Sequence, residues 1–161
     1  AWGGVVAQWV APILDVKAAS IPQLSVEKSV YAVAHSGEDR VVSDSYKQGE
    51  RLHVTLTLIC DRDLEYVTVN DSRAACLEPV EQISGYDAVD GVFVYKEIRN
   101  DVTNLFIPFL PKGKYVIDYE CFADRTGTYS LGIATAQSQY APEIAAHSAG
   151  TLITILPKTE D

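Results

Sequence analysis

The sequence predicts an all-β fold, an antiparallel β-sandwich, and three observations support this class. Apolar and polar residues alternate with a period of two through most of the long apolar runs. Short turn segments such as LPKGKY and DRTGTYS separate these runs and place glycine where a left-handed backbone is needed. No stretch of more than about ten residues carries a helical apolar stripe with caps.

The expected strands follow one another along the chain. The run 52–60 places leucine, valine and cysteine on one face and histidine and threonine on the other. The run 114–123 alternates in the same way, with Asp118 and Glu120 on its polar face. Pro108 predicts an edge strand or a strand end, because proline cannot donate to a ladder. The other expected strands are 23–33, 64–71, 91–99, 103–110, 127–140 and 150–157, so the total is about eight or nine.

The length and composition fit one domain. The chain has 161 residues, of which 47% are apolar, and we expect a single domain over residues 1–161 with a core between about 20 and 156. The opening AWGGVVAQWVAPILDV does not have the pattern of a signal peptide, and we expect a fragment of a longer protein. The net charge of −9 disfavours nucleic-acid binding, and the apolar runs are too short to span a bilayer.

The three cysteines, Cys60, Cys76 and Cys121, do not have the spacing of a zinc or redox site, and we expect small buried side chains. A disulfide between Cys60 and Cys121 stays open as an alternative. An internal thioester joins a cysteine to a glutamine three positions further on. Pro79 occupies that position after Cys76, and the next glutamine is Gln82. Cys76 is therefore not competent to form a thioester, and we expect it to be partly buried.

Catalytic and metal-ligating patterns are missing from the sequence. The histidines His35, His53 and His147 lack the spacing of a metalloprotease helix, and neither a GxSxG motif nor a nucleotide-binding loop is present. Neighbours in an extended chain point to opposite faces, so His147 and the serine after it are a poor base–nucleophile pair. Asp118 and Glu120 share the outer face of one strand with no sign of a cleft. We expect no enzyme activity, no cofactor and no metal.

Several turns and strand ends, taken in order, resemble those of one family. The most specific pieces are D-x-R-A-A-x-x-E-P-V at 71–80, L-P-K-G-x-Y at 110–115, and Y-A-P-E with H-S-x-G at 140–143 and 147–150. Together with the opening AWGGVVAQWV, they resemble the carboxy-terminal macroglobulin-like domain of bacterial alpha-2-macroglobulins. This is the tenth domain of that series, here in the form found in Bacteroidetes. The resemblance extends from about Ala1 to Ile155.

The resemblance implies a non-catalytic antiparallel β-sandwich that belongs to a larger protein. The parent proteins are exported, often lipid-anchored in the periplasm, and trap attacking proteases by a conformational collapse after cleavage of a bait region. In many of them a separate helical domain carries a thioester, and the last sandwich packs on that domain and shields the thioester from water. The implied partners are therefore the neighbouring domains, with proteases bound only through the parent.

The resemblance also indicates an interaction surface in the segment QSQYAPE. The candidate residues there are Gln139, Tyr140, Pro142 and Glu143. Tyr140 has a large ring with a polar tip, which suits an interface anchor. Many relatives have methionine at the position of Gln139, and this departure argues against a close apolar plug. The alternative is that Tyr140 covers the sandwich core and Pro142 only rigidifies a turn. Trp2 and Trp9 are further candidates, covering either the sheet edge or a neighbouring domain.

Two other classes of function stay open. A stand-alone adhesin or carbohydrate-binding module is the alternative, because sugar rings stack on exposed aromatic side chains. A flat exposed row of aromatic residues would favour sugar binding, whereas a compact patch near one end would favour domain docking. A hydrolase would need a cleft with convergent histidine, serine or carboxylate groups, and the sequence shows none in register.

Overall fold

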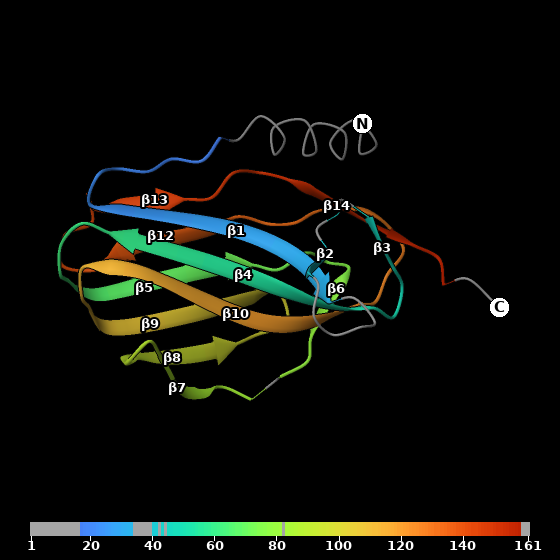
Figure 1. Ribbon diagram of the computed structural model, residues 1–161, viewed down its shortest axis with the longest axis horizontal. Coiled ribbons are helices and arrows are strands. Elements are labelled where there is room, and N and C mark those ends of the chain that lie inside the picture. The colour runs from blue at the N-terminus through green and yellow to red at the C-terminus, as the bar shows by residue number, and fades with distance from the viewer. Residues whose placement is uncertain (1–16, 34–39, 42, 44, 82, 159–161) are drawn as a thin grey trace.

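The computed structural model describes residues 17–33, 40–41, 43, 45–81 and 83–158, and the regular elements in these ranges are all β-strands (Figure 1). The fourteen strands are β1 Leu24–Val33, β2 Arg40–Val41, β3 Ser45–Lys47, β4 Arg51–Cys60, β5 Leu64–Ser72, β6 Leu77–Pro79, β7 Gly85–Val89, β8 Val92–Ile98, β9 Val102–Leu110, β10 Gly113–Ala123, β11 Gly127–Ser130, β12 Ala134–Ser138, β13 Ala145–His147 and β14 Leu152–Leu156. The predicted all-β class is confirmed. The described residues contain no helix that could cross a membrane.

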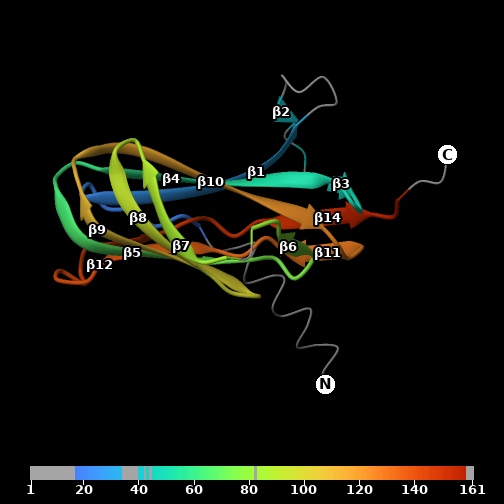
Figure 2. The same cartoon turned by 90° about the horizontal axis from the view of Figure 1, so that it is seen from below.

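Two sheets face each other to form the sandwich, as the view in Figure 2 shows. The first sheet has the strand order β2-β1-β4-β10-β6, and the second has the order β13-β12-β5-β9-β8-β7. All pairs within these two sheets are antiparallel. A smaller sheet, β11-β14-β3, lies at one end, and its β14–β3 pair is parallel. The fold is therefore antiparallel except for one short pair.

The structure has more strands than the alternation predicts, because several strands are too short to show a period. One expected strand, 127–140, is two strands in the structure, β11 and β12. The chain turns between them at Gly132, whose φ of +87° lies in the left-handed region that interrupts a strand. This conformation takes the chain from the small sheet to the second sheet.

The prediction that Pro108 marks an edge strand or a strand end is wrong for β9 as a whole, because β9 lies between β5 and β8 and continues past the proline to Leu110. The pairing of β9 with its neighbouring strands is interrupted at the proline instead. Pairing of β9 with β5 passes from Phe109 to Ile107, and pairing with β8 extends only as far as Phe106. The missing N–H of Pro108 is tolerated because neither neighbouring strand pairs with it.

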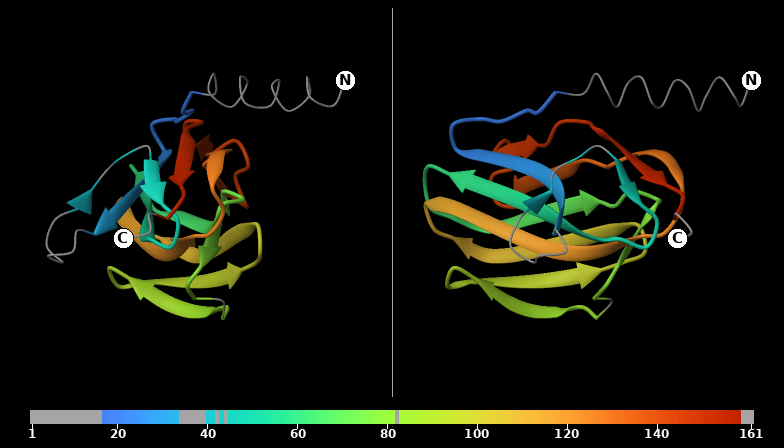
Figure 3. Two further views of the ribbon diagram at one scale, coloured as in Figure 1. Left: turned by 90° about the vertical axis from the view of Figure 1, so that its right-hand side faces the viewer. Right: turned by 45° about the vertical axis from the view of Figure 1, so that its right-hand side comes forward.

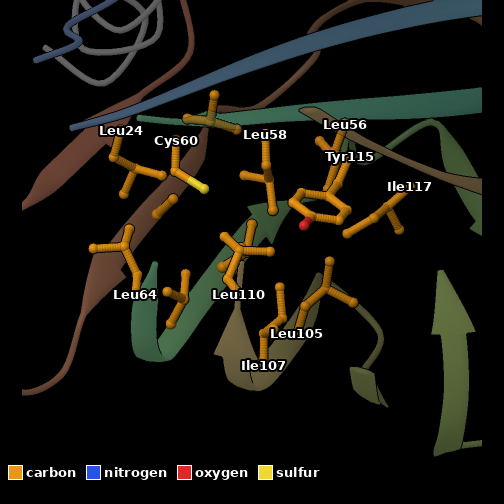
Figure 4. Close-up of a cluster of buried hydrophobic side chains, with 14 of the residues drawn as sticks. Leu24, Leu56, Leu58, Cys60, Leu64, Leu105, Ile107, Leu110, Tyr115 and Ile117 are labelled. Atoms are coloured by element: carbon orange, nitrogen blue, oxygen red, sulfur yellow. The ribbon is translucent and has the colours of Figure 1, made fainter. Parts of the chain in front are cut away.

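The core consists of two clusters of buried side chains between the sheets. Figure 4 shows part of the first cluster, in which the inward residues of β4 and β10 meet those of β5 and β9. Its labelled members are Leu24, Leu56, Leu58, Cys60, Leu64, Leu105, Ile107, Leu110, Tyr115 and Ile117. The second cluster joins the far ends of β4 and β10 to β6 and β14, and Tyr119 packs against both clusters. The two clusters form one apolar interior along the length of the sandwich.

A buried ion pair joins the two sheets. Lys28 on β1 and Asp71 on β5 have side chains that are 3% and 0% exposed, and Nζ lies 2.6 Å from Oδ1. Lys28 also donates to the carbonyl oxygens of Ser72, at 2.8 Å, and Leu131, at 3.0 Å. The hydroxyl of Tyr119 donates to the other oxygen of Asp71. Burial lowers the pKa of Lys28, and the charge of Asp71 opposes this change. The ammonium on β1 of the first sheet therefore has its partners on β5 of the second sheet and in the turn between β11 and β12.

The three cysteines are free thiols, so the open alternative of a Cys60–Cys121 disulfide is wrong. In the β4–β10 ladder, Cys60 is opposite Gly113 and Cys121 is opposite Leu52. These positions lie at opposite ends of the ladder, about 27 Å apart along the strands. Cys76 is fully rather than partly buried. Burial raises the pKa of Cys76 to about 11 and that of Cys121 to about 12, so both stay protonated.

We therefore expect almost no thiol of the native protein to react with Ellman's reagent at mildly alkaline pH. After unfolding in guanidinium without a reductant, all three thiols of each chain should react. Fast reaction of a thiol in the native state would contradict the buried positions. Reaction of only one thiol per chain after unfolding would indicate a disulfide and would contradict the ladder register.

Candidate docking surface

The predicted interaction segment forms the turn between β12 and β13, here called the Tyr140 loop, residues 139–144. The loop is closed by hydrogen bonds at its base. The amide of Ser138 donates to the carbonyl of Ile144, and the amide of Ile144 donates to the carbonyl of Ala141. The side chain of Gln137 donates to the carbonyl of Pro142 at 3.0 Å. These bonds fix the backbone on either side of Tyr140.

Tyr140 lies at the outer surface, against Tyr66 of β5. Its side chain is 70% exposed, so it does not cover the sandwich core. The two rings meet edge to face, with centroids 4.7 Å apart and planes at 73°. Tyr66 has a φ of +51°, an uncommon value for a residue with a side chain. Gln139 lies beside them and donates from its backbone to the carbonyl of Tyr66 and from its side chain to Thr68. The loop is thereby fastened to β5.

The other predicted site residues have simpler positions. Pro142 and Glu143 are exposed at the tip of the loop. Trp2 and Trp9 lie outside the described residues. Sequence reasoning missed Tyr66, because nothing in the alternation of 64–71 shows that this residue points away from the core beside the Tyr140 loop.

Aromatic side chains continue from Tyr66 across the outer face of the second sheet. The exposed rings are Tyr66, Tyr86, Phe93, Phe106 and Tyr140, and Tyr95 is half-buried among them. Tyr86 is opposite Tyr95, and Tyr95 is opposite Phe106, so the rings run across β7, β8 and β9. The β7–β8 hairpin that carries three of them lies at the lower edge of the second sheet in Figure 3. We call these six residues the aromatic face.

A cleft of about 580 Å³ opens between β10 and the β7–β8 hairpin, and Asp118, Glu120 and His53 all line it. The expectation that no cleft adjoins the two carboxylates is therefore wrong. The physical reason is that β6 pairs with β10 only over residues 121–123, which leaves the edge of the sandwich open before that point. A single-strand alternation pattern cannot show how far a neighbouring strand extends.

Three polar groups of this cleft, those of Tyr31, His53 and Asp118, are paired with one another. Asp118 accepts a hydrogen bond from Tyr31 at 2.7 Å, and its other oxygen lies 3.0 Å from Nδ1 of His53. The rings of Tyr31 and His53 stack 4.9 Å apart. Within the described ranges, no serine, threonine or cysteine hydrogen-bonds to the His53 ring. The nearby hydroxyl of Thr55 donates to Asp118 at 3.4 Å and not to the His53 ring, so these contacts do not pair a hydroxyl with the imidazole as a general base requires.

The remaining chemical candidates have structural partners. Nδ1 of His147 contacts the carbonyl of Ser148, while the Ser148 hydroxyl accepts from the amide of Ala134. The His147 ring and the Ser148 hydroxyl thus have separate partners in the structure. Among the residues that the structure covers, no group of three or more histidine, cysteine or acidic side chains is arranged to hold a metal.

The fold and the aromatic face define a β-sandwich with exposed aromatic side chains on the outer face of one sheet. A family model described as the bacterial alpha-2-macroglobulin MG10 domain matches residues 24–143, and the chain belongs to this family. Its position as the tenth domain of its parent and its Bacteroidetes form stay predictions.

Solved structures of bacterial alpha-2-macroglobulins have the same fold. The Salmonella protein reacted with methylamine matches with a TM-score of 0.70 and 24% identity, over 88% of this chain and 10% of that one. The trypsin-activated Escherichia coli protein matches with a TM-score of 0.69 and 17% identity, over 88% and 11%. A native Escherichia coli fragment from domain MG7 to the C-terminus gives 0.69 and 16%, over 87% and 24%. This chain thus spans a small part of each. The search of curated proteins gave no match.

Proposed function

We propose that the chain is a non-catalytic interaction domain of a bacterial alpha-2-macroglobulin-like protease-trapping protein. It packs with the Tyr140 loop on a neighbouring thioester-type helical domain and helps to hold the native state of the parent. The observation that carries the proposal is Tyr140, which is 70% exposed yet held by Tyr66 and by a hydrogen-bonded loop. A ring that is ordered before binding loses little conformational entropy when a partner covers it.

The mechanism is docking energy in a parent with two states. A tyrosine at the centre of an interface contributes about 2 kcal/mol or more, which shifts an equilibrium between two conformations roughly 30-fold. Cleavage of the bait elsewhere in the parent would release the contact, and no residue of this domain needs to react. Proteases are partners only through the parent. An exported parent in the periplasm or cell envelope is part of the same proposal and rests on the family resemblance.

A carbohydrate-binding or adhesin module is the second candidate, because the aromatic face is exposed. Its rings do not form a flat row, however. Tyr86 and Tyr95 are inclined by 60°, and Tyr95 and Phe106 by 35°. A sugar stacks on a ring through one flat side, and tilted neighbours offer no common plane to successive sugars. Packing of irregular apolar side chains suits this surface better, so we favour domain docking.

The first test of this function replaces Tyr140 by Ala. Titration of the purified chain into the neighbouring helical domain, followed by calorimetry, should show saturable binding that the substitution weakens roughly 30-fold. Phe122→Ala is the matched control, because Phe122 is an exposed ring on the first sheet and should leave binding unchanged. Binding that ignores Tyr140→Ala would move the contact to another face. If the two domains do not associate even when tethered in one chain, the docking function is refuted.

A further inference from the structure

The aromatic face is hollowed rather than flat. A groove of about 450 Å³ lies on it, bordered by Tyr66, Tyr86, Phe93, Tyr95, Phe106 and Gln139. Every residue that lines this groove is uncharged. Burial of a charged group in such a site would be unfavourable, whereas aliphatic side chains would lose only their contact with water. The groove therefore suits apolar side chains from a partner.

The groove is continuous with the Tyr140 loop. Tyr66 lines the groove, and its ring also meets the ring of Tyr140 edge to face. Gln139 belongs to the loop, lines the groove, and is hydrogen-bonded to Thr68 at 2.7 Å. A partner that covers Tyr140 would therefore lie against the near end of the groove.

The exposed area also favours a contact wider than the loop. Tyr140 alone presents about 150 Å², whereas the five exposed rings of the aromatic face together present about 600 Å². A stable protein–protein interface buries about 800 Å² on each partner. The loop tip is thus too small to hold a domain, and the aromatic face supplies most of the missing apolar area.

We propose that the helical domain that meets the Tyr140 loop also lays one α-helix in this groove, with aliphatic side chains three or four residues apart inserted between Phe93 and Tyr66. This inference rests on the proposed function and extends its contact across the sheet. A helix presents apolar side chains at that spacing along one face. A second copy of this chain is a poorer occupant, because each copy carries a net charge of −9.

Thiol labelling can locate the contact, since Cys60, Cys76 and Cys121 are all buried. A cysteine placed on the surface is then the thiol that a maleimide meets first. Phe93→Cys tests the groove, Tyr140→Cys tests the loop, and Val116→Cys on the first sheet is the exposed control. Labelling rates are compared between this chain alone and the full-length protein. We expect Phe93→Cys and Tyr140→Cys to be labelled at least about tenfold more slowly in the full-length protein, and Val116→Cys to be unchanged.

The outcomes separate this inference from the proposed function. Protection of Tyr140→Cys without protection of Phe93→Cys would overturn the groove contact and leave the loop contact intact. Protection of Phe93→Cys alone would support the groove and contradict the loop. If neither is protected, both are refuted. If cellohexaose slows the labelling of Phe93→Cys in the isolated chain while the full-length protein leaves it open, the groove is a glycan site and the inference is overturned.

A photo-crosslinker identifies the occupant. Benzoylphenylalanine at position 93 in the full-length protein should cross-link to one helix of the neighbouring domain, at aliphatic positions three or four residues apart. Cross-links to an extended segment or to a second copy of this chain would contradict the proposed helix.

Discussion

Replacement of Lys28 by Met is expected to lower the free energy of unfolding by about 3–5 kcal/mol, because it leaves the carboxylate of Asp71 buried without its cation. Both side chains are almost completely shielded from water, and the ammonium lies 2.6 Å from the carboxylate. The remaining donor to Asp71, the hydroxyl of Tyr119, cannot neutralise the charge. Urea unfolding of the variant and the wild type, with linear extrapolation, measures the difference.

The double variant Lys28→Met/Asp71→Leu is the informative control. It removes both charges, and apolar replacements of a buried pair are often close to neutral, so we expect most of the lost stability to return. Asp87→Ala is the surface control. Asp87 pairs with Lys96 at 3.0 Å, but its side chain is 53% exposed, and its loss should change stability by less than about 1 kcal/mol. A single Lys28→Met variant as stable as Asp87→Ala would show that the buried pair does not hold the sheets together.

The pH dependence of stability gives a second readout of the same site. Burial lowers the pKa of Lys28 below its ordinary value of 10.5, so the folded protein binds fewer protons here than the unfolded chain. At pH values between the lowered pKa of the folded state and 10.5, the contribution of this site to the free energy of unfolding therefore rises with pH. It is lost as the pH falls through that window. Lys28→Met should remove this component of the pH profile while the other titrating groups remain.

The sequence already contained a signal for this pair. In the run 24–33, Lys28 stands at a position that the alternation assigns to the core face, between Val26 and Val30. In the strand 64–72, Asp71 likewise stands at a position that the alternation assigns to the core face, after Val67 and Val69. A charge at a core position of a strand needs a partner, and two such charges of opposite sign predict each other. Period-two patterning thus indicates which residues are buried, but the pairing of strands across the sandwich decides which of them meet.

The candidate docking surface was predictable in part for a similar reason. The turn around Tyr140 follows from its own residues, because proline and the flanking polar residues indicate a turn. The partner ring of Tyr66 and the groove of the aromatic face depend on the pairing of β9 with β5, which are not consecutive strands, as well as on the pairing of β9 with β8. The alternation shows that Phe93 and Tyr95 share a face of β8. It does not show which face is solvent-exposed, because both faces of that strand carry apolar residues.

Gly132→Ala is expected to lower the free energy of unfolding by about 2–5 kcal/mol. The left-handed backbone accounts for about 1–2 kcal/mol of this loss for a residue with a side chain. Overpacking adds about 1–3 kcal/mol, because a Cβ at this position would overlap the backbone carbonyl of Ser72. Gly49→Ala separates the two effects. Its φ of +91° is close to the +87° of Gly132, but nothing lies near the added carbon. An equal loss in the two variants would show that the close approach to Ser72 is unimportant.

The position of Gly132 connects this prediction to the buried ion pair. Lys28 donates to the carbonyls of Ser72 and Leu131, and the close approach of the chain at Gly132 brings those two carbonyls to one ammonium. An added methyl group would push them apart and weaken the contacts of Lys28. The combined variant Lys28→Met/Gly132→Ala should therefore lose less stability than the two single losses added together, by more than about 0.5 kcal/mol. Full additivity would mean that the glycine and the ion pair stabilise the fold independently. A sub-additive result would identify the Gly132 turn as the feature that brings carbonyls of β5 and of the β11–β12 turn to one buried cation on β1.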